Sequence, residues 1–176
     1  MIMDKILVID NFLSSDEIIK CKEIIVNLLF VHGVTSDGNK KYFSTPFWGI
    51  DVNNNEFFRT TVIKIIEKKT CKRFRIHKIV VNAQTYGENG IYHIDNIEDG
   101  RYTFVLYFSN INKEELEHSE GCLEIKTPNE IFIASYEPEF NRGILFPSNY
   151  LHRGLSLSKH ISDIRISIAW KLKEIT

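Results

Sequence analysis

The segment DIRISIAWKL, residues 163–172, carries two kinds of side chain in strict alternation. One set of alternate positions is apolar: Ile164, Ile166, Ile168 and Trp170. The positions between them hold Arg165, Ser167 and Ala169. Because successive side chains of a β-strand point to opposite faces, the pattern predicts a strand with one apolar and one polar face. An arginine and a serine together on the polar face indicate an inner surface that holds an anion.

Short β-type runs of this kind fill the chain from Phe74 onward, with turn signals such as GENG, EDG, SEG, TPN, EPEFNRG and PSN between them. The other runs are FRIHKIVVNAQTY (74–86), RYTFVLYFS (101–109), CLEIKT (122–127), EIFIASY (130–136), GILFP (143–147) and YLHRGLSL (150–157). Many short strands with frequent turns favour an antiparallel sandwich or barrel over a parallel α/β sheet.

Helical signals precede these strands. After a short apolar run, ILVI (6–9), Ser14 and Glu17 have the spacing of a capping box. Apolar residues then recur at helical spacing, which predicts an amphipathic helix: Ile18, Cys21, Ile25 and Leu28. A second helix is expected near Asn55, with a buried side made of Phe58, Val62, Ile65 and Ile66.

The predicted fold is therefore mainly β with N-terminal helices. It is a jelly roll, the cupin-like double-stranded β-helix, with two or more helices packed on the outside. We expect one domain over residues 1–176, with a helical support region at 1–72 and the jelly-roll core at 73–176.

Composition narrows the class of protein. The 176 residues carry a formal net charge of -1 and are 43% hydrophobic, which is typical of one soluble globular domain. Near-neutral charge removes any global case for a nucleic-acid or membrane partner. No export signal or membrane-length apolar run is evident, and Cys21, Cys71 and Cys122 form no CxxC pair. These features favour a cytoplasmic protein with reduced thiols.

One basic stretch, Lys68 to Lys78, has two interpretations. It could form a patch for nucleic acid or an acidic partner. It could equally be a helix C-terminus, where cations complement the helix dipole, followed by a strand with a solvated face. The second interpretation is favoured, because runs of charge are usually solvated.

The stretch IYHIDN, residues 91–96, places a histidine and an aspartate two positions apart. On a strand, His93 and Asp95 would share one face, either to bind a metal ion or as polar residues on a wet surface. The spacing alone favours the wet surface. A further candidate ligand, His152, follows the strand GILFP, whereas we expect three other histidines at the surface: His77, His118 and His160.

Together these residues match one chemistry. Two histidines and one carboxylate bind Fe(II) on one side and leave the other octahedral positions open. A 2-oxo acid and O2 need those positions, and the far carboxylate of the acid needs a charged partner. The planar guanidinium of Arg165 suits that carboxylate, and the Ser167 hydroxyl adds a donor.

Longer motifs carry a family resemblance. They are, in order, QTYGENGIYHID (84–95), YTFVLYFSN (102–110), GCLEIKTP (121–128), EPEFNRGILFPSNYLHRG (137–154) and RISIAW (165–170). With them the chain resembles the Fe(II)/2-oxoglutarate dioxygenases, in particular the prolyl-4-hydroxylase-like branch, from ILVIDNFLSSDEI (6–18) to RISIAWKL (165–172). One departure is Cys122, which stands where the family usually has the second of two glycines.

The resemblance implies His93, Asp95 and His152 as iron ligands. It implies Arg165 as the 2-oxoglutarate clamp that completes the catalytic set, with Ser167 as its partner. Two tyrosines are further candidates for the co-substrate pocket. Tyr107 either meets the distal carboxylate or is a core tyrosine, and Tyr86 would line the pocket on one strand face with Asn82 and Gln84. The implied cofactors are Fe(II), 2-oxoglutarate and O2, with ascorbate as an optional addition.

The resemblance also implies hydroxylation of a C–H bond with release of succinate. The expected substrate is a prolyl residue of a peptide or protein, or a small amino acid. One alternative is nucleic-acid demethylation, which is ranked low because no second arginine follows Arg165 on its strand. Another alternative is a cupin-like metal-binding protein without catalysis.

Three segments are candidates for the mouth of the site: STPFWG (44–49), YGENG (86–90) and the acidic NINKEELEHSEG (110–121). We expect the last to form a mobile flap. Within the first, Trp48 is interpreted as a staple between helix and sheet. An acidic flap beside a basic stretch favours a polar, peptide-like or amino-acid substrate.

Overall fold

The computed structural model describes residues 6–36, 45–126 and 133–175. Its N-terminal half contains β1 (Leu7–Ile9), α1 (Ser15–Ile25), β2 (Val31–Val34), β3 (Phe47–Asp51), the π-helical η2 (Phe57–Val62) and α2 (Ile63–Thr70). The rest contains β4 (Phe74–Gln84), β5 (Arg101–Tyr107), α3 (Lys113–Leu116), β6 (Leu123–Lys126), β7 (Ile133–Tyr136), β8 (Gly143–Pro147), β9 (Leu151–Gly154) and β10 (Arg165–Glu174).

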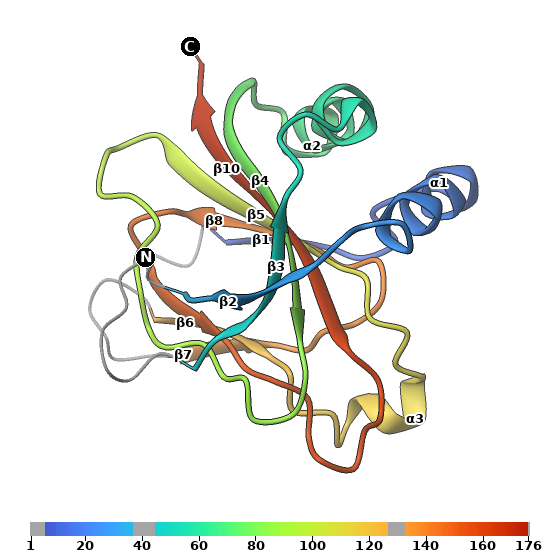
Figure 1. The fold of residues 1–176 in the computed structure, drawn as a ribbon. Helices are drawn as coiled ribbons and strands as arrows, with labels where there is room; N and C mark the ends of the chain where they lie inside the picture. Colours follow the sequence, from blue (N-terminus) through green and yellow to red (C-terminus); the bar gives the residue numbers. More distant parts are fainter. Residues whose placement is uncertain (1–5, 37–44, 127–132, 176) are drawn as a thin grey trace.

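Two antiparallel sheets form the body of the molecule (Figure 1). The major sheet has seven strands in the order β1-β8-β5-β10-β4-β3-β2, and the minor sheet has three in the order β7-β6-β9. This arrangement confirms the mainly β jelly roll with few helices. The first 72 residues are not only a helical support, however, because β1, β2 and β3 all join the major sheet.

The helices begin and end where local chemistry allows. At the start of α1, the backbone N–H and the Oγ of Ser14 both donate to Glu17 Oε2, at 2.7 and 2.8 Å, so the expected capping box is present. The last turn of α2 carries Lys68 and Lys69, and Cys71 follows in a left-handed conformation with φ 54°. The basic stretch therefore contains a helix C-terminus, as its favoured interpretation states.

The two faces of the major sheet have different neighbours. One face packs against α1 and α2 and forms the larger apolar core, around Phe58, Ile66, Phe104 and Trp170. Trp170 is fully buried, and its indole Nε1 donates to the Phe58 carbonyl at 3.3 Å. The opposite face turns toward the minor sheet, and there Val105 and Ala169 belong to a smaller apolar cluster with Leu123 and Ile125. That inner face positions the site described next.

No helix among the described residues is long and apolar enough to cross a membrane.

Candidate metal and co-substrate site

A cavity of about 340 Å³ lies between the inner face of the major sheet and the minor sheet. Its lining comes from β2, β3, β4, β5, β6, β9 and β10, together with the segment that carries His93 and Asp95. The cavity-facing residues of β10 are Arg165, Ser167, Ala169 and Lys171. The alternation predicted from the sequence therefore extends two residues beyond Ala169, so that Lys171 also faces the cavity.

The IYHIDN segment is not the strand that its sequence predicts. It forms a single bridge, in which His93 and His152 exchange backbone N–H···O bonds of 3.0 and 2.9 Å. Beyond that bridge the backbone N–H groups of Asp95 and Asn96 both bind the Ser148 carbonyl, so the ladder does not continue. The segment is instead fixed against β9 and the turn before it, and this brings His93 opposite His152.

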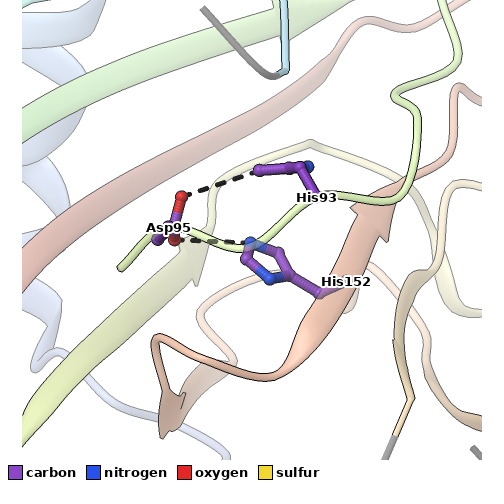
Figure 2. A group of neighbouring side chains, drawn as sticks. All are labelled: His93, Asp95 and His152. Carbon is purple, nitrogen blue, oxygen red and sulfur yellow. Dashed lines mark ion pairs between the residues drawn. The ribbon is translucent and has the colours of Figure 1, made fainter. Parts of the chain in front are cut away.

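His93, Asp95 and His152 converge on one point (Figure 2). One potential ligand atom from each lies within 4.8 Å of the others. His93 Nε2 is 3.6 Å from Asp95 Oδ1, and His152 Nε2 is 3.3 Å from Asp95 Oδ2. Three ligand atoms that each lie about 2 Å from one ion are separated by distances of this order. Two imidazoles and one carboxylate are also the donor set of a 2-His-1-carboxylate iron site, so these residues fit Fe(II).

The backbone sets the orientation of both imidazoles. His93 Nδ1 lies 3.0 Å from the Ile91 carbonyl, and His152 Nδ1 lies 2.8 Å from the Tyr150 carbonyl. A carbonyl only accepts, so each Nδ1 must carry the proton and donate it. The Nε2 lone pair of each ring is then free to face the common point, as a metal-binding histidine requires.

Burial and neighbouring charge set the protonation of the group. Burial, reinforced by the nearby His152, lowers the pKa of His93 to about 4 and keeps its imidazole neutral at pH 7. Burial alone would raise the pKa of Asp95, but the positive charge of Lys171 holds it well below its usual range. A neutral imidazole and an ionised carboxylate are the forms that bind a metal ion.

Asp95 has two further partners that sequence reasoning missed. Thr103 Oγ1 donates to Asp95 Oδ2 at 2.5 Å, and Ser148 Oγ in turn lies 3.0 Å from Thr103 Oγ1. The Lys171 ammonium also donates to Asp95 Oδ2. The alternation of strand side chains could have predicted that both face the cavity, since Thr103 shares a strand face with Val105 and Lys171 shares one with Arg165.

Arg165 is buried, with an exposed fraction of 3%, and its guanidinium donates four hydrogen bonds. Its Nε donates to the Gly121 carbonyl at 2.7 Å, and Nη1 donates to Gln84 Oε1 at 2.7 Å and to Ser167 Oγ at 3.3 Å. Its Nη2 donates to the Tyr107 hydroxyl at 3.2 Å. A guanidinium fixed on several sides is pre-organised to meet a carboxylate.

Gly154 allows this arrangement, because a Cβ there would lie 3.0 Å from Arg165 Nη2. The structure thus brings Arg165, Ser167, Gln84 and Tyr107 together. Tyr107 is fully buried, and burial raises the pKa of its phenol, so the hydroxyl stays protonated.

Tyr86 does not line the cavity, and that expectation is wrong. The strand ends at Gln84, and a turn closed by the Glu88 N–H on the Thr85 carbonyl follows. The two-residue alternation that places Asn82 and Gln84 in the cavity therefore stops before Tyr86, which is 64% exposed.

The expected mouth segments also need correction. Phe47 lines the cavity, whereas no described residue of 86–90 or 110–121 does, and Ser44 lies outside the described residues. The acidic segment contains α3, begun by a capping box between Asn112 and Glu115. Trp48 is no staple between helix and sheet, because it is 40% exposed and its ring lies against that of His32, with centroids 5.0 Å apart and a tilt of 57°. In their place, Val34 at the end of β2 and the next two residues, Thr35 and Ser36, border the cavity.

Comparison with known proteins places this geometry in a family. The model of the 2OG-Fe(II) oxygenase superfamily matches residues 81–170, just over half of the chain. That range contains His93, Asp95, His152 and Arg165. None of the curated proteins matches the sequence.

Solved structures share the fold. One is a prolyl hydroxylase from Trichoplax adhaerens, solved in complex with a hypoxia inducible factor peptide fragment. It is 21% identical, with a TM-score of 0.74, and the match covers 98% of this chain and 84% of the hydroxylase. A Pseudomonas putida prolyl-4-hydroxylase is 12% identical, with a TM-score of 0.68. The match covers 97% of this chain and 94% of the hydroxylase. The α-ketoglutarate-dependent epimerase SnoN from nogalamycin biosynthesis is 11% identical, with a TM-score of 0.69. The match covers 98% of this chain and 77% of the epimerase.

The family match spans the strands that build the cavity, and a histidine–aspartate–histidine group lies inside it. The chain therefore belongs to the 2OG-Fe(II) oxygenase superfamily and is an oxygenase that uses Fe(II), 2-oxoglutarate and O2.

Proposed function

We propose that this oxygenase hydroxylates a C–H bond of a prolyl residue in a peptide or protein, or of a small amino acid. In this proposal His93, Asp95 and His152 hold the iron. Arg165 binds the distal carboxylate of 2-oxoglutarate, with Ser167 and Tyr107 beside it. The observation that carries the proposal is the convergence of the three ligand side chains within 4.8 Å inside a cavity that Arg165 also faces.

The roles of the side chains follow from their contacts. The two imidazoles direct their Nε2 atoms to the metal position because backbone carbonyls accept hydrogen bonds from their Nδ1 atoms. Thr103 holds one oxygen of Asp95 by its hydroxyl. Arg165 needs little rearrangement to bind a carboxylate, since hydrogen bonds to Gln84 and to the Gly121 carbonyl already fix the plane of its guanidinium.

When bound, the iron supplies the oxidation, in which one atom of O2 enters the C–H bond as hydroxyl while the other enters succinate and CO2 is released. The chain's own contribution is to orient the co-substrate and to present the substrate to the open side of the metal site. Val80, Val105, Leu123 and Ala169 form an apolar part of the cavity lining.

Two fold neighbours support a prolyl substrate, since both are prolyl hydroxylases and one holds a peptide. We also propose that residues 1–176 act as one domain, because strands from both ends of the chain share the major sheet. Three free cysteines suit a reducing cytoplasmic location.

Anaerobic titration with Fe(II) and then 2-oxoglutarate tests the site. A weak visible charge-transfer band is expected from the chelate in the wild type, and its absence would favour a metal-binding protein without this catalysis.

Turnover tests the substrate. 2-Oxoglutarate consumption should rise several-fold when a proline-rich peptide or free proline is added, and the product should gain the mass of one oxygen atom on proline. Stimulation by methylated oligonucleotides alone would instead support the demethylase alternative.

A further inference from the structure

Two lysines face the cavity from neighbouring strands, Lys78 on β4 and Lys171 on β10. They are direct partners across the antiparallel pair, so their side chains leave the sheet on the same face and side by side. Like charges placed directly opposite each other in a sheet are destabilising. Such a pair in the lining of a reaction cavity therefore points to an anion that lies between the two charges.

The cavity offers little negative charge to balance this pair. Asp95 is the only carboxylate among the described residues that line it. Lys171 donates to Asp95 Oδ2, and Lys78 makes no ion pair with any residue in the described ranges.

Binding of Fe(II) and 2-oxoglutarate would weaken the attraction between Asp95 and Lys171. Bound Fe(II), Arg165, Asp95 and the two carboxylates of 2-oxoglutarate balance one another in charge, whereas the two lysines stay uncompensated. Once a metal ion neutralises Asp95, the carboxylate attracts Lys171 less strongly. Thr103 still holds Asp95 Oδ2, so this oxygen keeps a partner when Lys171 turns away.

We propose that Lys78 and Lys171 bind a carboxylate of the substrate beside the C–H bond that is oxidised. This inference rests on the proposed function and adds a charge requirement to it. The carboxylate is either the α-carboxylate of a free amino acid or an acidic side chain next to the target residue of a peptide. The cavity of about 340 Å³ must also hold 2-oxoglutarate, so it leaves space for a group of about one residue.

Paired probes that differ in one charge test the proposal. One pair is acetyl-prolyl-glutamate amide and acetyl-prolyl-glutamine amide, and the other is L-proline and L-prolinamide. Binding is measured by calorimetry on protein loaded with Mn(II) and 2-oxoglutarate, so that no turnover is needed. The charged member of at least one pair should bind about fivefold or more tightly, as expected for a partly exposed charge pair. The pair that shows the preference identifies a peptide or an amino acid as the source.

Charge-matched variants assign the preference to the lysines. Lys78→Gln and Lys171→Gln should each reduce the preference, and the double variant should abolish it. Lys64→Gln removes the same charge from an exposed position on α2 and should keep the preference. Metal content is measured in every variant, because Lys171 also contacts Asp95. Higher ionic strength should weaken binding of the charged probes alone.

Three results would overturn the assignment: equal binding within both pairs, no binding of either charged probe, or a preference that survives in the double variant. Tighter binding of a single-stranded oligonucleotide than of every carboxylate probe would assign the lysines to phosphate and also overturn it. Failure of the proposed function is seen separately, as iron-loaded wild type that consumes no 2-oxoglutarate with any prolyl or amino-acid compound.

Discussion

The two faces of the major sheet belong to the same strands, but one packs in the apolar core and the other lines the cavity. The face toward α1 and α2 is apolar, and its largest side chain, Trp170, is fully buried. The face toward the minor sheet carries Arg165, Ser167 and Lys171 along the same strand, and these surround a cavity. Substitutions on the first face should therefore act on stability, whereas substitutions on the second should act on binding and turnover.

His93→Ala should have the largest effect, and on turnover alone. The change removes one of the proposed ligands, so succinate formation should be lost. The free energy of unfolding of the metal-free protein should change by no more than about 1 kcal/mol, since no apolar core is opened. His118→Ala, at an exposed position, is the control. Succinate formation at the wild-type rate in His93→Ala would remove this histidine from the site.

Trp170→Ala tests the opposite face. It empties a fully buried site and removes the hydrogen bond to the Phe58 carbonyl, so urea unfolding should show a loss of about 3–5 kcal/mol. Trp48→Ala removes the same side chain from a position that is 40% exposed and should cost far less. Equal losses from the two tryptophans would show that the helix-covered face is not the main source of stability.

Arg165→Lys keeps the charge on the cavity face but loses the bidentate fork. The concentration of 2-oxoglutarate needed for half-maximal turnover should rise about tenfold to a hundredfold, the equivalent of losing one or two charge-assisted hydrogen bonds. The Fe(II) requirement should change much less. Arg59→Lys, at an exposed position on η2, serves as the control. If the 2-oxoglutarate dependence stays the same while activity is retained, the clamp lies elsewhere.

Thr103→Val should have the smallest effect of the four. It keeps the shape of a buried side chain but removes the hydroxyl that donates to Asp95 Oδ2. Loss of a partner behind a metal ligand typically costs about tenfold or more in metal affinity, and Mn(II) titration would measure it. Thr60→Val removes an exposed hydroxyl from η2 for comparison. Unchanged affinity would mean that Lys171 and the histidines position Asp95 by themselves.

Most of the secondary structure could be predicted because its signals are local. The capping box at Ser14, the alternation along β10 and the turn residues between strands each depend on neighbours a few positions away. The strands β2 and β3 escaped prediction because both are short. β2 is also the edge strand, and little of it is buried.

The sequence by itself determined the fold class, the family motifs and the candidates His93, Asp95, His152 and Arg165, because residue type and spacing are read along the chain. Only the tertiary structure decided that His93 pairs with His152 through one bridge, and that Thr103 and Lys171 meet Asp95. It also showed that Tyr86 is exposed and does not line the cavity. The physical reason is that such contacts join residues far apart in sequence. They depend on strand register and on the path of the turns, which local periodicity does not encode.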